Sequence, residues 1–220
     1  MTTVIFAIQK KFEQFNNQLH SCYINSHMSK LSSTANKLQK QTYKIIHDLR
    51  LTEILLKDTE IKLVGSALYN LMTWRDLDLD IRTQDIPTDK MCLSLVQHLF
   101  GNSHIKKIIL VDNRDNSEPN RPRSVYVGPT YLDDMSNSWK IDIRVLAKKD
   151  AVVDSMEKLI NRKMTNVHKE HILQLKTLVC DNPKYHKGFS SVDIYEAVIL
   201  NKVTNIEELK SYLSSLGKSL

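Results

Sequence analysis

The sequence predicts an α+β protein in which a mixed β-sheet core, flanked by helices, is followed by a C-terminal helical domain. Three observations support this fold class: apolar residues recur at helical spacing in the first part of the chain, they alternate as in strands in the middle, and they return to helical spacing alone at the end. We therefore expect an N-terminal helical segment (1–57), a sheet core (58–148) and a helical domain (149–220).

The composition is that of a folded globular protein. The chain has 220 residues, of which 41% are hydrophobic and 25% are charged, and its net charge of +6 suits partners that carry phosphate. The apolar run Val4–Ile8 is too short for a membrane span and is not framed as a signal peptide. Cys22, Cys92 and Cys180 are too far apart for a disulfide framework or a CxxC metal site. We expect a cytoplasmic protein without membrane association.

The N-terminal segment contains one long amphipathic helix. From Ser29 to about Lys57, leucines and isoleucines recur at helical spacing with lysines between them. Residues 1–28 combine a short apolar run with a polar stretch, and three interpretations stay open for them: a helix, an interaction arm or a poorly ordered end.

The pattern changes to strands at Ile61. Ile61–Gly65 is predicted to be a short buried strand that leads into a helix over Ser66–Trp74. Asp76–Ile81 alternates strictly between acidic and apolar residues, which is typical of a strand with one buried face. Asp89–Phe100 is predicted to be a helix that covers the sheet.

Three more strands complete the predicted core. Two of them, near 105–111 and 124–131, are joined by the polar loop 112–122 as a long hairpin, and the third is the alternating segment 139–145. Beyond residue 148 the strand pattern ends. Four helices are predicted there: Val152–Ile160, His168–Cys180, Val192–Leu200 and Ile206–Leu216.

The acidic strand concentrates negative charge on one face. Residues two apart in a strand point to the same side, so Asp76, Asp78 and Asp80 follow one another at roughly 6 to 7 Å. Their repulsion requires basic neighbours, water or divalent cations. Mg²⁺ is the natural candidate, because it prefers carboxylate oxygens and is typically shared with substrate phosphates. The alternative is an exposed edge strand whose aspartates discourage aggregation.

Asp142 is the second acidic position. The apolar residues of 139–145 take one face of that strand and leave Lys140, Asp142 and Arg144 on the other. If this strand lies beside the first acidic strand, Asp142 completes a three-carboxylate cluster able to hold two metals about 3.5 to 4 Å apart. The alternative is a surface ion pair with Lys140 or Arg144.

Gly65 and Ser66 form a turn between a strand and a helix. Glycine lets the backbone turn without a Cβ clash, and Ser66 then occupies a position from which it caps the helix. The free N–H groups of the first helical turn bind anions, so a phosphate tail fits here. The alternative is an ordinary turn with an N-cap.

This order of elements resembles the nucleotidyltransferase superfamily, which shares its catalytic core with DNA polymerase β. The elements are a strand, a Gly-Ser turn, a helix, an Asp-x-Asp strand and a later single aspartate. The resemblance covers residues 61–146. It implies that the aspartates bind Mg²⁺ and that the Gly-Ser turn contacts a nucleoside triphosphate. The residues in these roles are Gly65, Ser66, Asp76, Asp78 and Asp142.

The position of the metal-binding pair stays open within the acidic strand. Asp76 with Asp78, and Asp78 with Asp80, both have a spacing from the Gly-Ser turn that is similar to the family's. We favour Asp76 and Asp78, because they are nearer the start of the strand, but Asp80 is kept as a candidate metal ligand.

The resemblance also implies a reaction. An acceptor hydroxyl attacks the α-phosphorus of a nucleoside triphosphate such as ATP, and pyrophosphate leaves. Asp142 is the favoured ligand of the nucleophile-side metal and a candidate proton acceptor. The C-terminal helices resemble domains that close over the nucleotide, where Lys176 either reaches the triphosphate or is a surface lysine.

The acceptor is expected to be a small molecule rather than a tRNA or a protein, because no appended RNA-binding module is recognised. The alternative function is a non-catalytic interaction module with the same fold, such as a toxin–antitoxin component. The sequence does not predict the oligomeric state.

Overall fold

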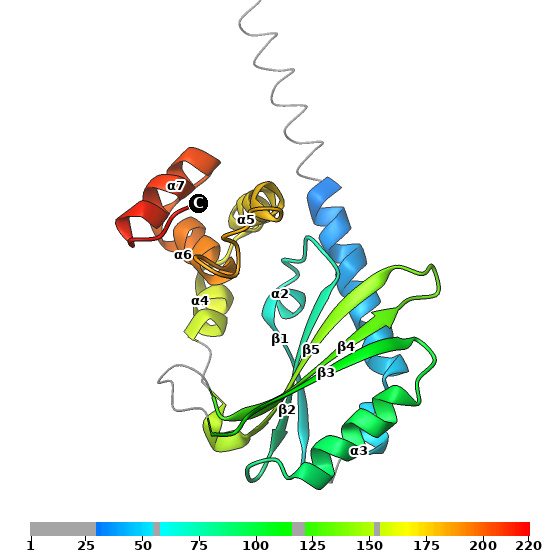
Figure 1. Ribbon diagram of the computed structural model, residues 1–220. Helices are drawn as coiled ribbons and strands as arrows, with labels where there is room; N and C mark the ends of the chain where they lie inside the picture. Colours follow the sequence, from blue (N-terminus) through cyan, green and yellow to red (C-terminus); the bar gives the residue numbers. More distant parts are fainter. Residues whose placement is uncertain (1–29, 55–57, 116–121, 152–154) are drawn as a thin grey trace, which may run out of the picture.

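The structure is a computed structural model that describes residues 30–54, 58–115, 122–151 and 155–220 (Figure 1). The three interpretations of residues 1–28 therefore lie outside the described residues. The described part consists of a sheet with helices on its two sides, followed by a group of helices at the C-terminal end.

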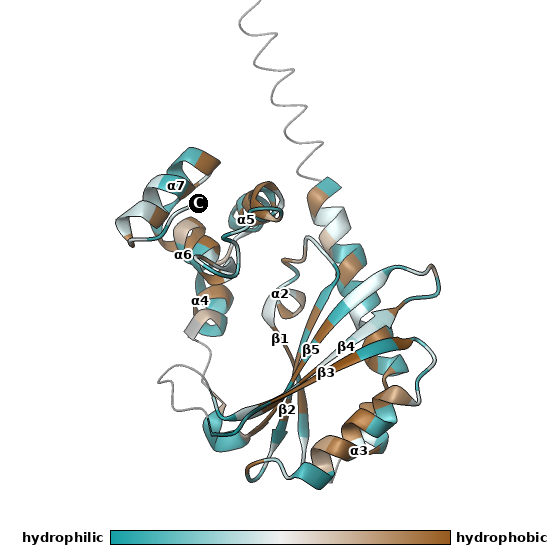
Figure 2. Cartoon of the chain, in the orientation of Figure 1, coloured by the Kyte–Doolittle hydropathy of each residue, from teal (hydrophilic) through white to brown (hydrophobic). Residues whose placement is uncertain are grey.

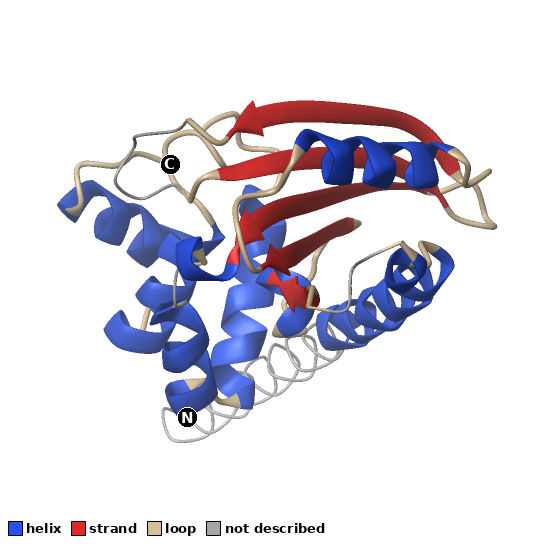
Figure 3. Cartoon of the chain, turned by 90° about the horizontal axis from the view of Figure 1, so that it is seen from below, coloured by secondary structure: helices blue, strands red, loops and turns tan. Residues whose placement is uncertain are grey.

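The five strands form one mixed sheet, as predicted (Figure 3). The order across the sheet is β1-β2-β5-β4-β3. The central pair, β2 and β5, is parallel, and the other three pairs are antiparallel. The strands are β1 (Glu60–Val64), β2 (Asp76–Thr83), β3 (Ile105–Asn113), β4 (Ser124–Leu132) and β5 (Ser138–Ala147).

One face of the sheet is covered by the helix over 30–48 and by α3 (Asp89–Phe100). The alternation of β2 and β5 sends one set of apolar side chains into this core, which Figure 2 shows as brown segments of sheet and helix. Thr88 caps α3 by accepting a hydrogen bond from the Met91 amide. The strand residues in this core include Leu77, Leu79, Ile81, Trp139, Ile141, Ile143 and Val145.

The N-terminal helix is shorter than predicted: it ends at residue 48, whereas the prediction extended it to about Lys57. Arg50 has a left-handed backbone with φ of 49°, and a short 3-10 helix, η1 (Leu51–Glu53), follows. Leu49 and Leu51 on either side of Arg50 are both buried in the core. The turn therefore lets both leucines pack inward, which a continuous helix would prevent.

The helix predicted over Ser66–Trp74 is also shorter, since α2 spans only Gly65–Leu68. Asn70 has a left-handed φ of 56°, and the Leu71 amide donates to the Ser66 carbonyl at 2.9 Å. The chain then continues as a loop to β2. Because Leu71 is fully buried in the second core, tertiary packing overrides the helical spacing of this segment.

The described residues after 154 form four helices, as predicted, with one isolated β-bridge between Tyr185 and Phe189. These four helices share a second core with residues of the loop after α2, and they lie beside α2 in Figure 1. Lys62 on β1 forms an ion pair with Glu157 at 2.8 Å and so joins the sheet to the helices. Within the described residues, no helix has the length and apolar character that a membrane crossing requires. The helices are α4 (Ser155–Lys163), α5 (Asn166–Val179), α6 (Ser191–Asn201) and α7 (Ile206–Ser215).

Candidate active site

Asp78 and Asp142 are direct neighbours across the parallel pair of β2 and β5. Residues opposite each other in adjacent strands point to the same face, so the two carboxylates lie together on the face opposite the sheet core. In the same register Asp76 is paired with Lys140, and Asp80 with Arg144. The sheet thus places a row of three aspartates on β2 beside a row on β5 in which Asp142 lies between two basic residues.

Two cavities border this acidic face. The larger, of about 650 Å³, extends along β1, β2 and β5. The smaller, of about 300 Å³, extends toward the C-terminal helices and is lined by Ser66, Asp76 and Tyr195 among others. Both cavities are lined by Gly65, Asp78 and Asp142. These three residues therefore lie where the two cavities meet.

Gly65 is required by two features of its position. Its φ of +64° is in the left-handed region, and a Cβ atom there would lie 2.4 Å from Asp78 Oδ2. The expected cap by Ser66 is wrong, because α2 begins at Gly65 and its N-cap, Val64, makes no side-chain cap hydrogen bond. Ser66 is instead inside the first helical turn and lines the smaller cavity.

Asp78 has the most perturbed carboxyl group of the site. Burial, followed by the negative charges of Asp76 and Asp142, raises its pKa from 3.8 to about 7. The positive charges of Lys140 and Arg144 only partly offset this rise. Near neutral pH the site therefore favours a proton or a metal cation at Asp78.

Asp142 is held through both of its oxygens. Tyr126 on β4 donates its hydroxyl to Oδ1 at 2.7 Å, and Lys140 donates to Oδ2 at 2.5 Å. Lys140 Nζ also lies 3.5 Å from Asp76 Oδ1. Burial alone would lower the pKa of Lys140, but its hydrogen bond with Asp142 and the charges of both aspartates raise it overall. The alternative ion pair of Asp142 with Lys140 is thus present.

Asp80 belongs to a different arrangement from Asp76 and Asp78. Its side chain is buried and forms ion pairs with Arg144 at 2.8 Å and with Arg82 at 3.2 Å. Two guanidinium groups therefore already balance its charge. This pairing favours Asp76 and Asp78 over Asp78 and Asp80 as the candidate metal-binding pair.

The carboxylate oxygens of Asp76, Asp78 and Asp142 are donors that suit Mg²⁺. In this structure the ammonium group of Lys140 lies between Asp76 and Asp142. Within the part of the chain that the structure describes, no group of three or more His, Cys, Asp or Glu side chains is arranged to hold a metal ion. Asp76 Oδ1, however, is buried without a hydrogen bond, and Asp78 is crowded by two other carboxylates. Mg²⁺ prefers hard oxygen donors such as these carboxylates.

Lys176 is a buried residue and not a surface lysine. Its Nζ donates to the Leu71 carbonyl at 2.7 Å and lies 4.7 Å from the centre of the Trp74 ring. Burial lowers its pKa to about 7, although Asp76 and Asp78 act in the opposite direction. Lys176 thus lies behind the loop that connects α2 to the acidic strand.

Sequence reasoning missed the role of Tyr126. Its strand was predicted, but only the sheet order places Tyr126 next to Asp142. The one signal in the sequence is the glycine two positions later, Gly128, whose missing side chain makes room for the Tyr126 ring.

Comparison with known proteins supports the fold. No protein-family model matches the chain, and no curated protein matches it. Among solved structures, Cid1 poly(U) polymerase with MgGTP bound is similar at a TM-score of 0.58 and 18% identity, over 79% of this chain and 55% of Cid1. A STING-associated CdnE c-di-GMP synthase from Capnocytophaga granulosa is similar at a TM-score of 0.51 and 17% identity, over 83% and 67% of the two chains.

The chain spans little more than half the length of Cid1. These structures are members of the DNA polymerase β-like nucleotidyltransferase superfamily, and this chain has their fold. The resemblance read from the sequence is thereby confirmed at the level of the fold.

Proposed function

We propose that this chain is a nucleotidyltransferase that moves a nucleoside monophosphate from a nucleoside triphosphate to an acceptor hydroxyl, with release of pyrophosphate. One observation carries the proposal: Asp78 and Asp142 lie side by side on the sheet, Asp78 is in contact with the left-handed turn at Gly65, and all three residues line the same cavities. This arrangement places a carboxylate cluster next to the first turn of a helix, where phosphates bind.

Each residue has a distinct proposed role. Asp76, Asp78 and Asp142 hold Mg²⁺, which when bound neutralises phosphate charge and lowers the pKa of the acceptor hydroxyl. Gly65 and Ser66 receive the triphosphate, because both line the smaller cavity beside Asp78. Asp142 is the candidate acceptor for the proton of the attacking hydroxyl.

Lys140 and Lys176 contribute positive charge in different ways. The Lys140 side chain is 63% exposed and reaches both Asp76 and Asp142, so it is free to move when a cation or a phosphate arrives. Lys176 lines neither cavity and is fully buried. We assign it to holding the loop between Leu71 and Asp76, which orients the acidic strand, and its direct contact with a triphosphate stays a prediction.

The proposed acceptor is a hydroxyl of a nucleotide. Cid1 is a poly(U) polymerase and CdnE makes c-di-GMP, so the acceptor in both similar structures is itself nucleotidic. The expected small-molecule acceptor finds no support in these comparisons. The net charge of +6 is compatible with an acceptor that carries phosphates.

The test is incubation of the chain with each of the four ribonucleoside triphosphates and Mg²⁺, with and without a single-stranded RNA oligonucleotide. Mass spectrometry reads the products. Growth of the oligonucleotide by whole nucleotides identifies an RNA acceptor, whereas products linked from triphosphates alone identify a second nucleotide.

Asp78→Asn is the matched inactive variant, because it keeps the size of the side chain and removes its charge. We expect it to abolish product formation while the protein stays folded. Absence of any product with the wild-type chain, together with a melting temperature unchanged by Mg²⁺ and triphosphate, would favour the non-catalytic module instead.

A further inference from the structure

Tyr126 contacts the acidic site from a neighbouring strand. Its hydroxyl, on β4, donates to Asp142 Oδ1 on β5 at 2.7 Å. This phenol is the hydrogen-bond donor of the pair, and the Asp142 carboxylate is the acceptor.

Gly128 makes this contact sterically possible. A Cβ atom at position 128 would lie 2.4 Å from the Tyr126 hydroxyl and 2.8 Å from two carbon atoms of its ring. The ring therefore lies against the backbone of Gly128, two residues along the same face of β4. A side chain at this position would push the hydroxyl away from Asp142.

The two oxygens of Asp142 have different partners. Oδ1 is bound by Tyr126, whose ring is confined by Gly128. Oδ2 is bound by Lys140, whose exposed ammonium group also reaches Asp76. The partner of Oδ2, Lys140, is exposed and can be displaced by a cation. The partner of Oδ1, Tyr126, is held in place by the backbone of Gly128.

We propose that Tyr126, seated on Gly128, is a positioning residue that fixes the Asp142 carboxylate with Oδ2 turned toward Asp76. The inference rests on the proposed function, because it takes Asp142 to be a metal ligand. Partners of ligating carboxylates orient them, and their loss typically weakens metal affinity or activity by about 10- to 100-fold.

The first test is Tyr126→Phe, which removes one oxygen atom and keeps the ring. Binding of Mn²⁺ is measured by electron paramagnetic resonance, without nucleotide and independently of turnover. We expect the affinity for Mn²⁺ to fall by about 10-fold or more. An unchanged affinity would overturn the proposal.

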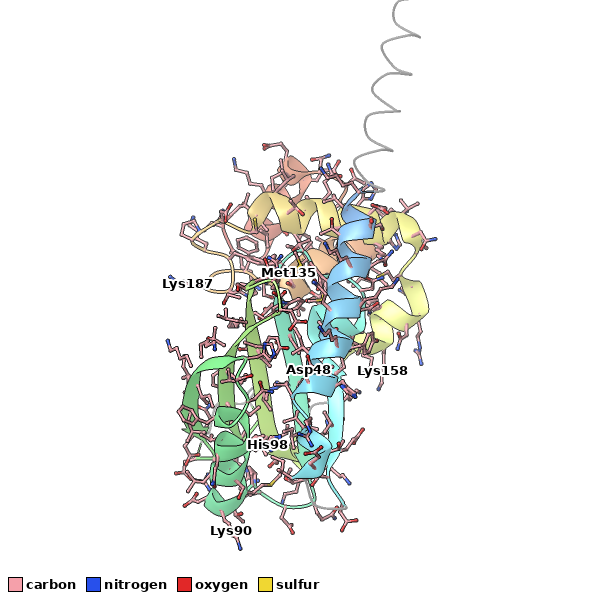
Figure 4. All side chains as sticks on the ribbon, turned by 90° about the vertical axis from the view of Figure 1, so that its right-hand side faces the viewer. Asp48, Lys90, His98, Met135, Lys158 and Lys187 are labelled. Atoms are coloured by element: carbon pink, nitrogen blue, oxygen red, sulfur yellow. The ribbon has the colours of Figure 1, made fainter. Side chains whose placement is uncertain are left out.

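Tyr131→Phe is the matched control. Tyr131 is on the same strand and donates to Asp48 at 3.0 Å, on the N-terminal helix at the other face of the sheet, where Figure 4 labels Asp48. It loses the same kind of hydrogen bond away from the acidic site. We expect its Mn²⁺ affinity to equal that of the wild-type chain, and an equal loss in both variants would reduce Tyr126 to a structural role.

The second test is Gly128→Ala, with Gly101→Ala as its control. A Cβ atom at Gly101 meets nothing closer than 3.4 Å, so that variant adds a methyl group without a severe clash. We expect Gly128→Ala to weaken Mn²⁺ binding as much as Tyr126→Phe does. In a chain that already carries Tyr126→Ala, the added Gly128→Ala should change the affinity no further, and a second, additive loss would contradict the proposed coupling.

The outcomes separate this inference from the proposed function. If Tyr126→Phe weakens Mn²⁺ binding but the wild-type chain transfers no nucleotide, the positioning role stands and the proposed function fails. If the wild-type chain is active and Tyr126→Phe matches it in Mn²⁺ affinity, KM and kcat, the function stands and the positioning role fails. Because Tyr126→Phe is nearly isosteric, the first test remains decisive even if Gly128→Ala does not fold.

Discussion

Gly65 and Asp78 are in such close contact that no other residue fits at position 65 without moving the carboxylate. The backbone of Gly65 is left-handed, and a Cβ atom there would lie 2.4 Å from Asp78 Oδ2. The turn that leads into α2 and the acidic strand are therefore packed in direct contact, so a change in one displaces the other.

Gly65→Ala should disturb both the left-handed turn and the Asp78 carboxylate. A left-handed alanine costs about 1 to 2 kcal/mol, and the new methyl group displaces the Asp78 carboxylate. Gly217→Ala is the control, because Gly217 has a similar φ of +70° but nothing lies within 4 Å of its Cβ position. Both variants should lose stability in urea unfolding, but only Gly65→Ala should lose nucleotide transfer. Equal activity in the two variants would contradict the contact.

Asp78→Asn should stabilise the protein in a pH-dependent way. The pKa of Asp78 is raised from 3.8 to about 7, so between these values the folded state holds a proton that the unfolded state has lost. The free energy of unfolding of the wild-type chain therefore falls as the pH rises through this range. The variant lacks this loss, and we expect it to be more stable by about 1 to 3 kcal/mol at pH 8 and by much less at pH 4. Thermal unfolding at both pH values, in the absence of divalent cations, measures the difference.

Asp76→Asn and Asp80→Asn should separate metal binding from stability. Asp80 is buried between Arg144 and Arg82, so its loss should cost about 1 to 3 kcal/mol of stability and leave Mn²⁺ affinity nearly unchanged. Asp76 has a buried oxygen without a hydrogen bond, so its loss should weaken Mn²⁺ binding at little cost in stability. The opposite result would move the metal-binding pair to Asp78 and Asp80.

Lys176→Met tests the buried ammonium group. The folded-state pKa of Lys176 is lowered from 10.5 to about 7, so between these values the unfolded chain binds a proton that the folded chain does not. This lysine therefore makes the wild-type chain more stable as the pH rises from 7 to 10. The stability of Lys176→Met relative to wild type should fall by roughly 3 kcal/mol between pH 6 and pH 10. The exposed Lys158, labelled in Figure 4, provides the control, because Lys158→Met should show no such trend.

The sequence predicted the sheet well because its strands have one clearly apolar face. The alternation in Asp76–Ile81 and in 139–145 requires one buried side, and both segments are central strands of the observed sheet. The helix Asp89–Phe100 was predicted with its observed bounds. The two helices that end early, near Leu49 and at Leu68, do so because a left-handed residue redirects the chain into a core, which depends on distant partners and not on local spacing.

The acidic residues and the Gly-Ser turn of the candidate site were predictable from the sequence, and their partners were not. Three aspartates in alternation, and a fourth on a later strand, carry a signal in their own spacing. Tyr126, the arginine partners of Asp80 and the burial of Lys176 depend on which elements become neighbours. The order of strands and the docking of α5 decide these contacts, and neither has a local pattern.

The parallel pairing of β2 with β5 makes the carboxylate cluster depend on contacts between distant parts of the chain. Asp78 and Asp142 are distant in the chain, and the hairpin of β3 and β4 lies between their strands in the sequence. Pairing of the acidic strand with its antiparallel neighbour β1 alone therefore leaves Asp142 apart from Asp76 and Asp78. Affinity for a divalent cation should consequently arise in one cooperative step, when β5 inserts between β2 and β4 and completes the sheet.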